Sequence, residues 1–170
     1  MANREALREL QSRLAERLQQ ARTQERVASW LAVEAGACGF LLPLEQAGEI
    51  FAPAPLVAVP HTRDWFVGVA NLRGRLYGVV DLARFLGLAS QPGDAARLVV
   101  FNPSLGLNCA LRVEQLAGLR GVGQLVAEPE AALPRPPFVG TRYLDPDGRR
   151  WQELNLSALA ADDAFIRIVA

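Results

Sequence analysis

The chain has 170 residues, 51% of them hydrophobic and 21% charged, which is enough apolar material for one compact unit or two small subdomains that share a core. Its 18 basic residues balance 18 acidic ones, so the basic excess of a nucleic-acid-binding protein is missing, and no apolar run is long enough for a membrane span. Residues 1–28 are densely charged and lack the apolar segment of a secretion signal. We therefore expect a cytoplasmic protein that binds no nucleic acid and does not insert directly into a membrane.

Residues 1–28 are assigned to an N-terminal amphipathic helix. Its apolar positions recur at intervals of three or four residues, which places them on one narrow stripe of the helix. These positions are Leu7, Leu10, Leu14, Leu18 and Ala21. The stripe predicts a helix that docks on the body of the protein, and pairing with a helix of a partner is the alternative.

From residue 29 onward the sequence predicts short strands separated by turns rich in Gly and Pro. The segment GEIFAPAPLVAVP (48–60) is predicted to be loop or edge strand, because proline cannot donate a hydrogen bond to a neighbouring strand. Three later segments each place two strand-like runs around a turn: 65–82, 97–113 and 141–156. This pattern is typical of an all-β barrel or sandwich.

The strand-rich part of the chain divides into two similar halves, at about 29–88 and 97–160. Each half predicts one small barrel. A barrel of about 60 residues would be marginally stable alone, so we expect the two to support one another.

The usual catalytic side chains are scarce. The chain contains no lysine, which excludes the lysines of P-loops, Schiff-base enzymes and protein kinases. His61 is the single histidine, the two cysteines Cys38 and Cys109 form no metal-binding motif, and no serine lies in a GxSxG motif. The sequence predicts a protein without catalytic residues, metal or cofactor, and an enzyme with a small-molecule site in a cleft between the barrels is the alternative.

The segment FVGVANLRGRLYGVVDLARFLG (66–87) resembles the central signature of CheW-like chemotaxis coupling domains. The positions that match are Gly68, Val69, Asn71, Leu72, Arg73, Gly74, Asp81, Leu82 and Gly87. The family usually has proline where this chain has Gly78, and the resemblance extends over about residues 30–160. It implies two intertwined five-stranded SH3-like barrels within residues 29–165, and the segment 66–87 most resembles adaptors of type IV pilus (twitching motility) chemosensory systems.

The resemblance also implies a non-enzymatic adaptor with two binding surfaces. One surface would bind the cytoplasmic tip of a chemoreceptor, a methyl-accepting protein. The other would bind the regulatory domain of a CheA-type histidine kinase. The alternative is a CheW-like module that binds the kinase without a receptor, and that either regulates the kinase or self-associates through its N-terminal helix.

Arg73 is the central residue of the receptor-binding surface that the resemblance implies. The family places receptor contact in a groove beside this arginine, and pairs it with an acidic residue that aligns with Glu49. Asn71 and Gly74 suit the backbone angles of a tight turn, which would hold Arg73 on a rigid support and reduce the entropy it loses on binding. The alternative is an internal salt bridge of little energetic value.

The apolar centre of the same surface is predicted to contain Ile50, Phe51 and Val57. Asn71 and Leu72 are counted with the receptor-binding residues, although a turn-forming role for Asn71 and a core position for Leu72 are their alternatives. Gly74 and Asp81 are predicted to be structural, because an acid at a strand end can accept turn N–H groups or cap the next helix.

Overall fold

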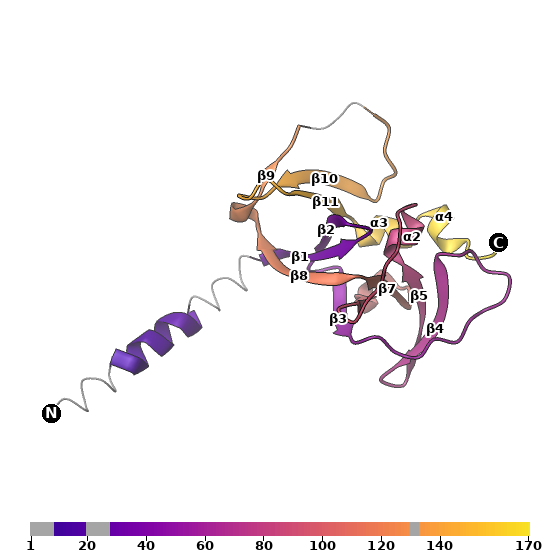
Figure 1. Ribbon diagram of the computed structural model, residues 1–170, viewed down its shortest axis with the longest axis horizontal. Helices are drawn as coiled ribbons and strands as arrows, with labels where there is room; N and C mark the ends of the chain where they lie inside the picture. The colour runs from indigo at the N-terminus through magenta and orange to yellow at the C-terminus, as the bar shows by residue number, and fades with distance from the viewer. Residues whose placement is uncertain (1–8, 20–27, 130–132) are drawn as a thin grey trace.

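The computed structural model describes residues 9–19, 28–129 and 133–170 (Figure 1). The β-strands are β1 (Ala28–Ala35), β2 (Cys38–Pro43), β3 (Ala47–Phe51), β4 (Phe66–Leu72), β5 (Arg75–Asp81), β6 (Arg97–Phe101), β7 (Cys109–Val113), β8 (Gln115–Gly121), β9 (Val126–Ala127), β10 (Val139–Leu144) and β11 (Arg150–Leu154). The labelled helices are α2 (Leu82–Phe85), α3 (Leu156–Ala160) and α4 (Asp163–Ile166), with 3-10 turns η1 (Pro103–Leu105) and η2 (Val122–Gln124). Residues 9–19 form an N-terminal helix.

The strands form two sheets, which confirms the predicted all-β fold. One sheet has the order β8-β1-β2-β11-β10-β9, and the other has the order β3-β6-β7-β5-β4. The first has six strands rather than five because the two-residue strand β9 adds to the outer side of β10. In Figure 1, β9, β10 and β11 lie on the side of the molecule opposite the β4–β5 hairpin, with α2, α3 and α4 between them.

The two sheets do not follow the predicted halves of the chain at 29–88 and 97–160, so that boundary is wrong. Strands β1 and β2 come from the first half of the chain but lie in one sheet with β8, β9, β10 and β11. Strands β6 and β7 come from the second half but lie in one sheet with β3, β4 and β5. Two long-range pairings cause this exchange: β1 runs antiparallel to β8, and β2 runs parallel to β11. The sheets are therefore intertwined, as the resemblance implies.

The N-terminal helix is present but its predicted docking is wrong for the residues that the structure describes. Every residue from 9 to 19 is exposed, and Leu10, Leu14 and Leu18 are 65%, 61% and 58% exposed. Three leucines on a narrow stripe offer little area to bury, which is the physical reason that docking is not enforced. Residues 1–8 and 20–27 of the predicted helix lie outside the described residues. Residue 28, the last residue of the predicted helix, is instead the first residue of β1. No helix in the described part of the chain is long and apolar enough to cross a membrane.

Three groups of buried side chains hold the sheets together. The shared core takes side chains from both sheets and from α3 and α4, and includes Val33, Phe101, Leu111, Leu154 and Phe165. The five-strand core consists of Ala70, Leu72, Val79, Leu98, Val100 and Ala110. The six-strand core consists of Trp30, Ala32, Leu41, Leu125 and Trp151.

Alternation along single strands explains how one chain supplies all three cores. In β6, Leu98 and Val100 face the five-strand core, while Val99 and Phe101 face the shared core. Successive side chains of a strand point to opposite faces, so a strand buried on both faces must be apolar at every position. The unbroken run LVVF (98–101) is the sequence signature of this double burial.

Candidate functional site

The β4–β5 hairpin ends in a two-residue turn formed by Arg73 and Gly74. Both residues have positive φ angles, 52° and 81°, which is the signature of a type I′ turn. Leu72 pairs with Arg75 across the hairpin, and the Gly74 N–H donates to Oδ1 of Asn71 at 2.8 Å. The turn therefore has the geometry expected from the sequence, and it holds a non-glycine residue in a conformation that such residues seldom adopt.

Arg73 reaches from this turn to the opposite edge of the same sheet. Its Nη1 donates to both carboxylate oxygens of Glu49, each at 2.9 Å, and its guanidinium carbon lies 5.5 Å from the centre of the Phe51 ring. Glu49 and Phe51 belong to β3, which is at the far end of the five-strand order from β4. The five-strand sheet is therefore curled, and the Arg73–Glu49 ion pair connects its two edges.

The Arg73–Glu49 pair is exposed to solvent. The two side chains are 75% and 59% exposed, and an exposed pair of this kind contributes about 0–1 kcal/mol to stability. The ion pair orients the guanidinium of Arg73 and uses only its Nη1. Arg73 makes no other hydrogen bond to the described residues, so Nε and Nη2 are available to a partner.

Exposed apolar residues lie next in the chain to Glu49 and on the loop that follows. Ile50 is 42% exposed and Val57 is 71% exposed. The backbone of Val57 is fixed against β4 by two hydrogen bonds with Val69, both 2.9 Å long. This close approach requires a glycine at position 68, because a Cβ there would lie 2.5 Å from the carbonyl oxygen of Val57.

Two residues assigned to the receptor-binding set have other roles in the structure. Leu72 is only 4% exposed and belongs to the five-strand core, so its assignment to a binding surface is wrong. Phe51 is half-buried and packs against the same core, with one face under Arg73. Asn71 is exposed, and its side chain accepts the N–H of Gly74 in the turn. We call the other exposed members of the set, Glu49, Ile50, Val57 and Arg73, the Arg73 surface.

Asp81 has the structural role that the sequence predicts. It is 2% exposed, and its Oδ1 accepts the Arg84 N–H at 3.0 Å as the N-cap of α2. Its Oδ2 accepts from Ser90 Oγ at 2.6 Å and from Nη2 and Nε of Arg112 at 2.6 and 3.2 Å. Burial alone would raise the pKa of Asp81, but the hydrogen bonds from Ser90, Arg84 and Arg112 and the charge of Arg112 together lower it.

The partner residue Arg112 was not found by reasoning from the sequence. It lies 31 residues beyond Asp81, directly opposite it where β7 runs parallel to β5. Only knowledge of that strand pairing could have identified it.

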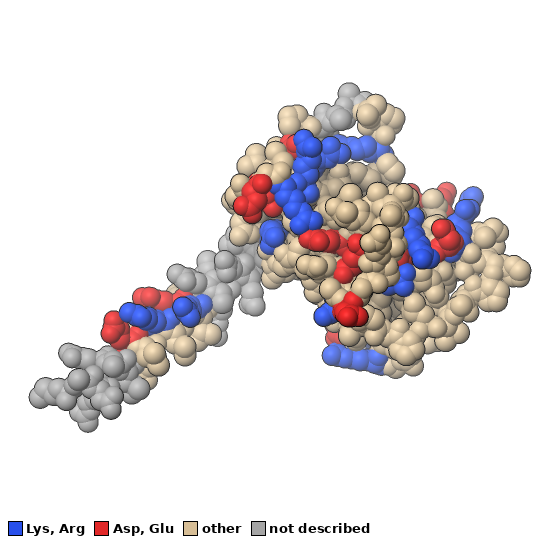
Figure 2. All heavy atoms as spheres, in the orientation of Figure 1, with Lys and Arg blue, Asp and Glu red and all other residues tan. Residues whose placement is uncertain are grey.

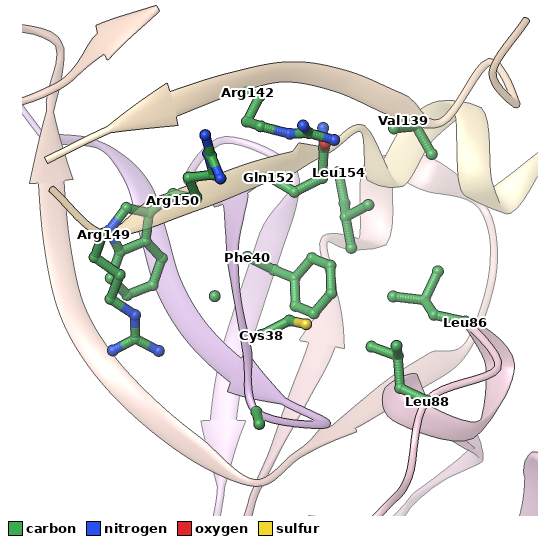
Figure 3. Close-up of a pocket in the computed structure, with 13 residues that line it drawn as sticks. Cys38, Phe40, Leu86, Leu88, Val139, Arg142, Arg149, Arg150, Gln152 and Leu154 are labelled. Carbon is green, nitrogen blue, oxygen red and sulfur yellow. The ribbon is translucent and has the colours of Figure 1, made fainter. Parts of the chain in front are cut away.

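Two pockets lie away from the Arg73 surface. One, of about 520 Å³, is lined by β2, β10, β11 and the chain after α2 (Figure 3). The other, of about 710 Å³, lies among α2, α4 and the loop before β10. Within the described residues no three His, Cys, Asp or Glu side chains come together as potential metal ligands.

The two intertwined sheets agree with a known family of domains. The model of the CheW-like domain family matches residues 29–164, and the chain belongs to this family.

Two individual relatives each match a smaller part of the chain than the family model does. The chain is similar to Protein PilI of Pseudomonas aeruginosa, with 32% identity over 99 residues that cover 57% of this chain and 56% of PilI. The alignment thus spans a little over half of the length of this relative. The fold of the present chain is similar to that of the scaffolding protein TtCheW from Thermoanaerobacter tengcongensis. The TM-score is 0.63, the sequence identity is 17%, and the match covers 75% of this chain and 88% of TtCheW.

Proposed function

We propose that this protein is a non-enzymatic cytoplasmic adaptor that couples a chemoreceptor to a CheA-type histidine kinase. Membership of the CheW-like family supports a coupling or scaffolding role. Similarity to PilI supports a chemosensory system of the type IV pilus, or twitching-motility, kind. The adaptor would act by holding receptor and kinase in one assembly, not by chemistry.

The observation that carries the proposal is the presentation of Arg73. A two-residue turn fixes its backbone, Glu49 fixes one guanidinium nitrogen, and Nε and Nη2 have no partner among the described residues. Ile50 in β3 and Val57, which pairs with Val69 of β4, supply exposed apolar area at the two edges of the same sheet. A guanidinium that is already ordered loses little entropy on binding. Apolar residues with a charged rim are the usual anatomy of a protein interface, and arginine is enriched there.

The test compares two charge reversals in the same hairpin. Arg73→Glu places a carboxylate beside Glu49 and is expected to weaken binding of a receptor cytoplasmic-tip fragment by at least about tenfold, since it replaces attraction by repulsion at the interface. The matched control is Arg75→Glu, an exposed arginine two residues away with no ion pair among the described residues. Binding is measured by calorimetry with purified receptor fragment and, separately, purified kinase regulatory domain.

Arg73→Glu should leave the melting temperature within about 2 °C of the wild type, because the pair that it breaks is exposed. It should also leave kinase binding unchanged if the two partners use separate surfaces. Undiminished receptor binding by Arg73→Glu at unchanged melting temperature would contradict the proposal.

The second candidate function is a CheW-like module that binds the kinase without a receptor. The exposed stripe formed by Leu10, Leu14 and Leu18 favours it, because such a stripe can mediate self-association. Wild-type protein that binds the kinase domain and not the receptor fragment would select this function over the first.

A further inference from the structure

The pocket of about 520 Å³ opens between the β10–β11 hairpin and the chain that follows α2. Its volume lies in the range of small-molecule sites, about 300–1,000 Å³. Figure 3 shows the side chains of Phe40 and Leu154 pointing into this space, with Leu86 and Leu88 facing them from the other side. This apolar part of the pocket lies well away from the Arg73 surface, which contributes none of its lining residues.

Three arginines line the opposite part of the pocket. Arg142 comes from β10, Arg149 from the turn before β11 and Arg150 from β11 itself. Figure 2 shows a band of basic side chains over these strands. Of the described residues that line the pocket, none is acidic. One wall is therefore cationic and the other apolar.

Two of these arginines already have carboxylate partners. Arg149 Nη1 lies 2.6 Å from Glu34 Oε1, and its guanidinium stacks 4.5 Å from the centre of the Trp151 ring. Arg150 Nε lies 3.2 Å from Glu128 Oε1. These contacts compensate the two charges and fix the two side chains in place.

Arg142 is different. Its side chain is exposed and makes no ion pair or hydrogen bond with the part of the chain that the structure describes. Figure 3 shows its guanidinium above Leu154 and alongside the side chain of Gln152, its partner across the β10–β11 hairpin, at the edge of the apolar space. The pocket thus presents one uncompensated cation, with five N–H donors, beside an apolar cavity.

We propose that this pocket binds a small amphipathic organic anion, with its carboxylate or phosphate on Arg142 and its apolar body between Phe40, Leu86 and Leu88. A charge-assisted pair with a guanidinium provides orientation, and the apolar cavity provides the area that a purely ionic ligand could not bury. The arrangement matches one anionic group on one apolar body, which distinguishes it from a surface for a long acidic polymer. The proposal is independent of the adaptor function.

The first test uses 2-naphthoate as the probe and 2-naphthalenemethanol as its neutral analogue, titrated into the full chain by calorimetry at pH 7. Naphthoate should bind, and both the neutral analogue with wild-type protein and naphthoate with Arg142→Gln should bind at least about tenfold more weakly. Arg75→Gln is the control, because it removes another exposed arginine that lies outside the pocket. Arg142 is exposed on β10, so its variant is expected to fold.

A second measurement places the probe in the pocket. Cys38 lines the pocket and is exposed, whereas Cys109 is buried, and burial raises the pKa of the Cys109 thiol to about 12. Naphthoate should therefore slow alkylation of Cys38 by iodoacetamide, followed by mass spectrometry, with a half-maximal concentration that matches calorimetry. Cys109 should stay unmodified throughout.

The following results would overturn the proposal. The first is the absence of naphthoate binding, and the second is equal binding of the neutral analogue. The third is naphthoate binding that leaves the alkylation rate of Cys38 unchanged. The fourth is binding of poly-L-glutamate without binding of naphthoate, which would make the arginine wall a surface for a macromolecule.

Discussion

Two arginine–carboxylate pairs in the same sheet show how burial decides what such a pair does. Arg73 and Glu49 are both mainly exposed, so water screens their attraction and the pair contributes little to stability. Arg112 and Asp81 are 19% and 2% exposed, and the carboxylate also accepts hydrogen bonds from Ser90 and the backbone of α2. Removing one member of a buried pair leaves a charge without compensation, which is costly. The first pair is suited to recognition and the second to the fold.

Asp81→Ala is therefore expected to lower the free energy of unfolding by about 3–5 kcal/mol at pH 7. The variant loses the cap of α2 and leaves Arg112 facing a buried site without a carboxylate. Chemical denaturation followed by tryptophan fluorescence measures the change. Asp94→Asn, at an exposed position, is the control and should change the free energy of unfolding by less than about 0.5 kcal/mol.

The same residue gives a prediction about pH. The pKa of Asp81 is lowered in the folded protein from its ordinary value of 3.8, so the folded state binds its proton less readily than the unfolded state. Its contribution to stability is complete above pH 3.8 and is lost as the pH falls through the lowered folded value. The difference in melting temperature between wild type and Asp81→Asn should thus be constant from pH 7 to about 5 and shrink below pH 4. A difference that grows on acidification would contradict this assignment.

Single residues differed in how far the sequence could predict them. The cap role of Asp81 and the turn role of Asn71 follow from local chemistry, since both act on a backbone N–H three residues away. The prediction that Leu72 lies on the binding surface rests on its match to the family signature, whereas strand alternation places it in the core. Ala70 and Leu72 point to the core, and Asn71 between them points to solvent, as the period of two requires.

At the scale of elements, hairpins were predictable and strand exchange was not. The β4–β5, β6–β7 and β10–β11 pairs are all antiparallel and adjacent in the chain, so turn residues and apolar runs identify them. The β2–β11 and β5–β7 pairs are parallel and distant in the chain. No local pattern specifies such pairs, because their register is set by the cores that they complete.

The N-terminal helix gives a prediction at this scale. Deletion of residues 1–27, which ends just before β1, should leave the melting temperature of the remaining protein within about 2 °C of the wild type, because every residue from 9 to 19 is exposed. Receptor and kinase binding should also survive. Differential scanning fluorimetry and the calorimetric assays measure both properties.

A matched variant separates the leucine stripe from the rest of the helix. Leu14→Gln removes the central exposed leucine, whereas Ser12→Gln changes a neighbouring exposed position outside the stripe. If the stripe mediates self-association, light scattering should show a smaller oligomer for Leu14→Gln alone. A melting temperature lowered by more than about 5 °C on deletion would instead indicate that the helix docks on the body.

At the scale of the whole molecule, the shared core makes the two sheets one cooperative unit. The same strands that fill the five-strand and six-strand cores turn their other faces to the shared core. Opening either sheet would therefore expose the apolar faces of the other. A small barrel on its own buries too little surface to be stable, and here neither is alone.

One unfolding transition is therefore expected, whichever sheet is perturbed. Leu98→Ala leaves a cavity in the five-strand core and Leu41→Ala leaves one in the six-strand core, and each should lower the free energy of unfolding by about 2–5 kcal/mol. Native-state hydrogen exchange should show that each variant lowers amide protection by the same free energy in β1 and β2 as in β6 and β7. Leu76→Ala, at a 63% exposed position, is the control and should have little effect. Protection lost in one sheet and kept in the other would mean that the shared core does not couple them, because a coupled core admits no stable half-folded state.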